Sequence, residues 1–350
     1  MMEMSSFSKQ NTNFIKGIAI ITLIVHHLTG QNPGVPVNIH TSTILSIVGT
    51  EAKVCVALFM ILSGYGMAVS YKGNQSNIIK FAYNHIVKLL FNFWPMFVFC
   101  WLLYMLLGNS FANIYGTGMK SVMYFVKDFF GMHNFIIVTP SINGSFWFME
   151  AVILCYLLFP LFYKIMENKY LQYALLILTY IPWIVYMIHG KSAYGWHTDR
   201  ELYYFFSFVV GMYLAQNDVL NCLVRKMNQS KLAGFIISLV CLIITFILRV
   251  YICLPVDPIF AVSIIVFLIE CIAILPPNIL SDWIEKFGIY SSDIYMFHLS
   301  LLILINFIPI INIKVKLIAF ILLCYCIGAG INGLKKCINY HKLAMLFTWK

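Results

Sequence analysis

The stretch "LAGFIISLVCLIITFILRVYI", residues 232–252, is apolar almost throughout and carries a single charge, at Arg249. A helix needs about 20 mainly apolar residues to cross roughly 30 Å of hydrocarbon. The stretch therefore predicts a membrane-spanning helix. Runs of the same kind recur along the whole chain, so the fold is expected to consist of many such helices.

The composition is typical of a membrane protein. Of the 350 residues, 61% are hydrophobic and 10% are charged, and the mean hydropathy is +0.86, whereas a soluble protein keeps about a quarter of its residues charged. The ten cysteines lie mostly inside apolar runs and lack metal-binding spacing. We expect them to be buried side chains, with no disulfide framework and no bound metal.

The net charge of +10 is read as lysine-rich cytoplasmic loops rather than as a nucleic-acid surface. The polar stretch 1–13 precedes the first apolar run, so we expect no cleaved signal peptide. One integral-membrane domain over residues 1–350 is predicted, with no appended soluble domain.

Ten apolar runs are long enough to be candidate spans, which predicts an all-α polytopic helix bundle. An even number places both termini on one side of the membrane. The larger share of the 23 lysines and arginines then falls on that side, which predicts cytoplasmic termini. Segment 111–136 is expected to be a loop with an interfacial helix. The ten runs are 14–31, 43–71, 82–107, 146–166, 170–189, 201–217, 232–252, 258–276, 289–309 and 314–334.

The first span begins at Lys16 and carries His26 and His27. Lys16 and His27 are eleven residues apart, so on a helix they lie within about 20° of one face and roughly 16 Å apart along the axis. A neutral imidazole has a pKa near 6.5 and can accept a proton from a hydroxyl. Both histidines could equally be side chains at the outer end of a helix, and the spacing leaves this open.

Other ionisable residues inside spans are candidates for functional sites, because a charge is costly within a membrane. A stretch of small residues is a further candidate. Ser63 and Tyr65 belong to the small-residue stretch 59–68, where plain helix packing is the competing interpretation. His85 and Lys88 share a face at the start of the third span, where ordinary flanking charge is the alternative.

Glu150 follows Trp147 and Phe148, a pair expected at the membrane interface, and could orient an imidazole or simply face water. Arg249 and Glu270 are expected to pair with each other. Tyr295 and His298 lie in the ninth span, where His298 could be structural.

Six stretches in register are similar to motifs of the bacterial acyltransferase 3 family of multi-pass membrane acyltransferases. In that family the first span begins with arginine and glycine and carries a histidine eleven positions on; here Lys16 stands in the arginine's place and His27 at the histidine. The third-span motif usually has two arginines three apart, and His85 takes the place of one of them. The stretches are "KGIAIITLIVHH" (16–27), "LFMILSGYGMA" (58–68), "HIVKLLFNFWP" (85–95), "GSFWFMEAVILCYLLFPLF" (144–162), "FFSFVVGMYLA" (205–215) and "SSDIYMFHLSLL" (291–302).

The resemblance implies transfer of an acyl group, commonly acetyl, from cytoplasmic acyl-coenzyme A to a hydroxyl of an extracytoplasmic glycan or lipid-linked sugar. It implies His27 as the base or as a transient acyl carrier, and Lys16, His85 and Lys88 as the donor's phosphate-binding residues. Glu150, whose carboxylate could orient an imidazole, is the second candidate catalytic residue. Lysine lacks arginine's bidentate fork, so phosphate attraction is expected to survive better than tight orientation. Five residues are expected to support the site or the substrate: Ser63, Tyr65, Trp147, Tyr295 and His298.

The expected location is the bacterial cytoplasmic membrane, with membrane lipid as surroundings and no nucleic-acid partner. The oligomeric state, a homodimer included, is left open. A transporter or export component for a cell-surface polysaccharide intermediate is the competing hypothesis, although no convincing inverted repeat is detected. A membrane scaffold without chemistry is the third.

Overall fold

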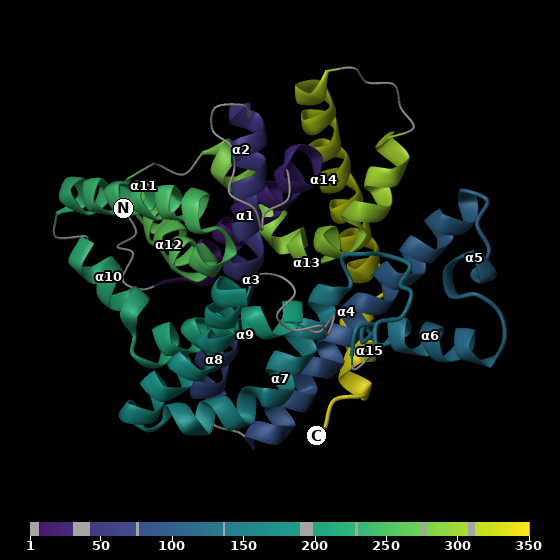
Figure 1. Cartoon of the computed structure of the whole chain (residues 1–350), viewed down its shortest axis with the longest axis horizontal. Helices are drawn as coiled ribbons and strands as arrows, with labels where there is room; N and C mark the ends of the chain where they lie inside the picture. The colour runs from purple at the N-terminus through teal and green to yellow at the C-terminus, as the bar shows by residue number, and fades with distance from the viewer. Residues whose placement is uncertain are drawn as a thin grey trace. The chain divides into compact units, whose positions relative to one another are not determined.

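The computed structural model describes residues 7–30, 43–74, 77–135, 137–189, 199–227, 230–274, 278–306 and 312–349. These residues fold into α-helices joined by short loops, and the described ranges contain no β-strand. Figure 1 shows the helices in chain order. They are α1 Lys9–Thr29, α2 Ile44–Glu51, α3 Cys55–Asn74, α4 Ile78–Leu106, α5 Phe111–Tyr115, α6 Met119–Phe129, α7 Trp147–Met166, α8 Lys169–His189, α9 Asp199–Gln216, α10 Val219–Met227, α11 Lys231–Ile252, α12 Asp257–Ile274, α13 Ile279–Asn306, α14 Ile313–Cys337 and α15 Tyr340–Leu346.

Within the described ranges, nine apolar segments are long enough to cross a membrane. The predicted all-α polytopic bundle is therefore confirmed. The predicted span 43–71 is interrupted by a 3-10 turn at Ala52–Val54, which separates α2 from α3. The predicted span 201–217 coincides with α9, whose apolar part Leu202–Gln216 is shorter than the other nine.

Other boundaries differ from the prediction for a physical reason. Helix α13 begins at Ile279, ten residues before the predicted start at 289, because charged residues end an apolar run without ending a helix. The segment predicted as an interfacial helix forms two short helices, α5 and α6. The predicted span ends at 31, 276 and 309 lie outside the described residues.

The chain divides into two compact units. The first contains Met1–Asn74, Phe162–Ala193 and Tyr203–Ile289, and the second contains Gln75–Leu161, Tyr194–Leu202 and Tyr290–Lys350. In the first unit, α11 and α12 run alongside each other (Figure 1), and the hydroxyl groups of Thr245 and Ser263 lie 2.7 Å apart between them.

Two of the motif stretches pack against each other in the first unit. Gly64 of α3 faces the backbone of Phe208 in α9, and Gly211 of α9 faces the backbone of Ile61 in α3. A Cβ added at Gly64 would stand 2.9 Å from the carbonyl carbon of Phe208 and nearer still to its oxygen. Glycine is therefore needed at both positions for this close helix contact.

The second unit is tied together by polar side chains from distant parts of the sequence. Asn143 is buried in the loop before α7, and its amide donates to Met296 O at 2.7 Å and to Ser300 Oγ at 2.9 Å. Its amide oxygen accepts from the backbone N–H of Ser145 at 2.9 Å. Asn143 therefore fixes the loop against α13.

Candidate active site

The last turn of α1 carries His26 and His27. The ring of His26 is buried, and its Nδ1 lies 2.9 Å from the carbonyl oxygen of Gly49 in α2. A carbonyl oxygen only accepts, so Nδ1 carries the hydrogen, and Nε2 is the acceptor of the neutral ring. This hydrogen bond fixes the orientation of His26.

Two glycines allow α2 to come this close to α1. A Cβ added at Gly30 would stand 2.7 Å from Gly49 O, and one added at Gly49 would stand 2.7 Å from Gly30 N. These distances are shorter than ordinary carbon contacts, so a side chain at either position would push the two segments apart. The end of α1 is thus held by backbone contact as well as by His26.

The ring of His27 packs beside that of His26. Their ring centroids are 5.0 Å apart, and the ring planes cross at 60°. His27 is half-buried, whereas His26 is only 8% exposed. The pair therefore combines one buried imidazole that supports the helix end with a second that is partly exposed.

A buried ionic cluster also joins α2, α11 and α12. Nη1 of Arg249 lies 3.0 Å from Glu51 Oε2, and Nε of Arg249 donates to Asp257 Oδ1. All three side chains are at most 3% exposed. Lys53 is within electrostatic range of both His26 and Asp257. The two buried acids thus share the buried Arg249 as their contact cation, and the half-buried Lys53 adds positive charge nearby.

This cluster corrects one prediction and supplies a residue that the sequence analysis missed. Arg249 pairs with Glu51 and Asp257, so the expected pair of Arg249 with Glu270 is wrong. The carboxylate of Glu270 instead lies against Gly234, where an added Cβ would stand 3.0 Å from Oε2. Glu51 is the one acid inside the predicted span 43–71, and that signal could have identified it.

Lys16, Ser63 and Tyr65 also belong to the first unit. Lys16 is half-buried on the helix that carries His27. Ser63 is half-buried, and Tyr65 is buried with its ring edge-on to Phe7 at 5.2 Å. Both flank Gly64, so their backbone lies at the close contact between α3 and α9.

His85 and Lys88 lie on α4 in the second unit. Nδ1 of His85 is 2.9 Å from the carbonyl oxygen of Phe81, one turn earlier, and the two ring centroids are 4.1 Å apart. The hydrogen is therefore on Nδ1, which leaves Nε2 as an acceptor when the ring is neutral. Lys88 is exposed and within electrostatic range of His85. The predicted shared face of these two residues is present.

Glu150 is fully buried in the first turn of α7, at 0% exposure, so the alternative of a carboxylate facing water is wrong. Its Oε2 accepts from the backbone N–H of Asn134 at 2.8 Å. Lys127 of α6 donates to the carbonyl oxygens of Phe135 at 3.0 Å and Ile137 at 2.6 Å. Burial lowers the pKa of Lys127, and the nearby Glu150 carboxylate acts in the opposite direction. Glu150 thus anchors the loop before α7.

The remaining predicted residues lie in the second unit. Trp147 is buried in the protein at the first residue of α7. The ring of Tyr295 packs 4.5 Å from that of Phe148, and the fully buried His298 has its Nδ1 2.7 Å from Tyr295 O. Neighbouring Asp293 accepts from Lys335 Nζ at 2.7 Å.

The structure thus places Lys16, His27, Ser63 and Tyr65 in the first unit. It places the other predicted site residues, among them Glu150, in the second unit. Within the described ranges, no three His, Cys, Asp or Glu side chains are grouped as metal ligands would be.

The long apolar helices define a multi-pass membrane protein, and the comparisons with known proteins give its family. A family model described as an acyltransferase domain matches residues 10–332, nearly the whole chain. The chain belongs to the acyltransferase 3 family, as the six motif stretches predicted, and it is a membrane acyltransferase. No curated protein and no solved structure gives a significant match.

Proposed function

We propose that this protein transfers an acyl group, commonly acetyl, from cytoplasmic acyl-coenzyme A to a hydroxyl of an extracytoplasmic glycan or lipid-linked saccharide. The proposed location is the bacterial cytoplasmic membrane, with both termini in the cytoplasm. The observation that carries the proposal is the half-buried imidazole of His27 at the end of α1, beside a neighbour that is held in place.

In the proposed reaction, the neutral imidazole of His27 accepts the proton of the acceptor hydroxyl. The hydroxyl oxygen forms a bond to the thioester carbonyl carbon, the carbon–sulfur bond breaks, and the coenzyme A thiolate leaves and takes the proton. General base catalysis of this kind contributes about 10²–10⁴-fold to a rate. A transient acyl group on His27 is the alternative route to the same products.

The donor's phosphates are proposed to bind Lys16 of the first unit, and the phosphate-binding role of His85 and Lys88, which lie in the second unit, stays a prediction. Lys16 is on the same helix face as His27 and roughly 16 Å from it along the axis, which suits phosphates at the cytoplasmic mouth and a thioester deeper in the membrane. Lysine attracts phosphate as a point charge but does not form the bidentate hydrogen bonds of arginine. The catalytic role of Glu150 stays a prediction, and its contact with Asn134 supports a role in shaping the loop.

The test uses the purified full chain in vesicles with acetyl-coenzyme A that carries a labelled acetyl group and a hydroxyl-bearing glycan fraction. Thioester cleavage and the acetyl mass on the glycan are both measured. His27→Gln is expected to lose about 10²-fold or more in kcat. Val25→Ala, at a half-buried position on the same helix, is the matched control and is expected to keep its activity.

Full activity of a folded His27→Gln protein would overturn the assignment of the base. Movement of glycan across the vesicle membrane without thioester cleavage would overturn the acyltransfer proposal in favour of the transporter alternative. Lys16→Arg restores the family's residue and is expected to lower KM for acetyl-coenzyme A with little change in kcat, because it acts on donor binding.

A further inference from the structure

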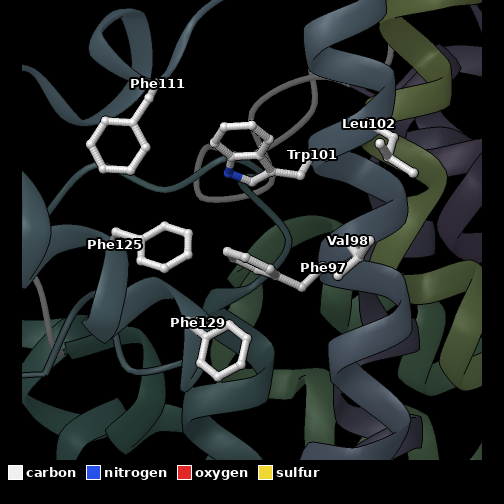
Figure 2. A pocket seen from close by; sticks show the side chains of 7 residues that line it. All are labelled: Phe97, Val98, Trp101, Leu102, Phe111, Phe125 and Phe129. Carbon is white, nitrogen blue, oxygen red and sulfur yellow. The ribbon is translucent and has the colours of Figure 1, made fainter.

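An apolar pocket of about 360 Å³ lies between α4, α5 and α6 of the second unit. Figure 2 shows Phe111, Phe125 and Phe129 on one wall and Phe97 and Trp101 on the facing wall. Five of the seven lining side chains are aromatic. The lining is Phe97, Val98, Trp101, Leu102, Phe111, Phe125 and Phe129.

The walls of the pocket are held by polar contacts behind them. Trp94 of α4 donates from Nε1 to the carbonyl oxygen of Phe129 at 3.1 Å, which joins α6 to α4. Asp128, also on α6, is fully buried and accepts from Tyr115 OH at 2.7 Å and from Ile142 N at 2.8 Å. The pocket is therefore preformed.

The pocket lies toward the C-terminal end of α4, a helix long and apolar enough to cross a membrane. Leu102 and Phe97 precede Leu106, the last residue of the span, by four and nine residues, or about 6 and 14 Å along the helix axis. Half of a hydrocarbon core of roughly 30 Å is about 15 Å. The pocket is thus near one end of the span, over a length of α4 that is comparable to half of the hydrocarbon core.

The opening of the pocket is continuous with the apolar surface that faces lipid. Val98 and Leu102 line the pocket and are 51% and 56% exposed. Met105 and Leu106, also exposed, extend the same apolar surface to the end of α4. A hydrocarbon chain in the adjacent leaflet can therefore reach the pocket without crossing a polar rim.

We propose that this pocket binds one acyl chain of a bilayer phospholipid. A polar occupant would lose its hydrogen bonds to water and meet no exposed polar atom in the lining, which is costly. The volume lies at the low end of the roughly 300–1,000 Å³ of small-ligand sites, which suits one chain rather than a whole lipid. The site is separate from the acyl transfer proposed above.

The test is photolabelling of the full chain in phosphatidylcholine vesicles that contain a phosphatidylcholine with a diazirine on one acyl chain. Labelled peptides are mapped by mass spectrometry. We expect the label to be enriched several-fold per exposed residue on 97–102 and 125–129 over α11, whose exposed face is also apolar.

Val98→Phe fills part of the pocket and is expected to at least halve the label on these peptides. Leu106→Phe adds an aromatic ring on the same helix outside the pocket, at a residue that is 83% exposed, and is expected to leave the label unchanged. An even distribution of label over exposed apolar residues in the unmodified protein would overturn the proposal, and this outcome needs no variant to fold.

A competition experiment distinguishes two sources of the hydrocarbon chain, a phospholipid and a polyprenyl phosphate. Excess unlabelled phosphatidylcholine is expected to reduce the pocket label in proportion to its amount. If a polyprenyl phosphate displaced the label at concentrations where phosphatidylcholine did not, the pocket would be selective for an isoprenoid chain and the phospholipid assignment would be wrong.

Discussion

Replacing Gly64 of α3 by alanine adds one methyl group to a helix contact that has no room for it. The added Cβ would stand 2.9 Å from the carbonyl carbon of Phe208 and 3.2 Å from its Cα, whereas ordinary contacts begin at 3.4 Å. These are backbone atoms, so no side-chain rotation can relieve the overlap. The two helices would have to separate by more than 0.5 Å, the difference between 3.4 and 2.9 Å.

The expected cost is about 1–3 kcal/mol, the usual range for overpacking a tight contact. Gly66 offers the matched control, because an alanine Cβ there would meet no described atom within 4 Å. Gly66→Ala is expected to be neutral or to stabilise by about 0.5–1 kcal/mol, since alanine favours the helix. The same glycine-to-alanine change is therefore expected to destabilise the protein at Gly64 and not at Gly66.

The assay is thermal unfolding in detergent, followed with a dye that fluoresces when it reacts with exposed cysteine thiols. Cys55 on α3 is buried and becomes available to the dye when α3 unfolds. Gly64→Ala is expected to lower Tm and Gly66→Ala to keep or raise it. Indistinguishable Tm values for the two variants would show that α3 and α9 do not pack in this way.

Three further predictions concern the polar groups. Arg249→Met leaves Glu51 and Asp257 buried without their cation and is expected to destabilise the protein by about 3–5 kcal/mol; a Tm equal to that of the unmodified chain would contradict burial of the cluster. Burial raises the pKa of Asp128 from 3.8 to about 6. The protonated Asp128 carboxyl therefore contributes to the stability of the fold at acidic pH, and this contribution is lost as the pH rises from about 4 to 6. The stability of the unmodified chain relative to Asp128→Asn should fall over that window by about 3 kcal/mol; a difference that is flat with pH would refute this. Asn143→Leu leaves the Ser145 N–H without its acceptor and is expected to lower the free energy of unfolding by about 1–3 kcal/mol. Hydrogen exchange in residues 141–146 is expected to become faster, and unchanged exchange there would argue against the loop anchor.

The sequence predicted the helices well where the length of an apolar run alone decides them. A run such as 232–252 must be helical in a bilayer because its backbone polar groups have no other partner there. The start of α13 was missed because Asp282, Glu285 and Lys286 end the apolar run while the helix continues. Apolar length predicts the part of a helix that lies in lipid, and it says little about the part outside.

For the candidate site, the sequence predicts residues, whereas their contacts depend on the tertiary structure. The spacing of Lys16 and His27 follows from helix geometry alone and needs no tertiary structure. The pairing of Arg249 with Glu51 depends on how α2 meets α11, and nothing local in the sequence encodes that meeting. The buried position of Glu150 likewise depends on the loop that donates the Asn134 N–H.

The partners Glu51 and Arg249 have a consequence for how the protein is made. They are separated by 198 residues, so at about 5–20 residues per second the ribosome reaches Arg249 roughly 10–40 s after Glu51. During that interval the only nearby cation made with Glu51 is the half-buried Lys53, two residues on. The buried pair of Glu51 with Arg249 can form only after α11 has been made. Helices α2, α11 and α12 are therefore expected to pack together in one late assembly step.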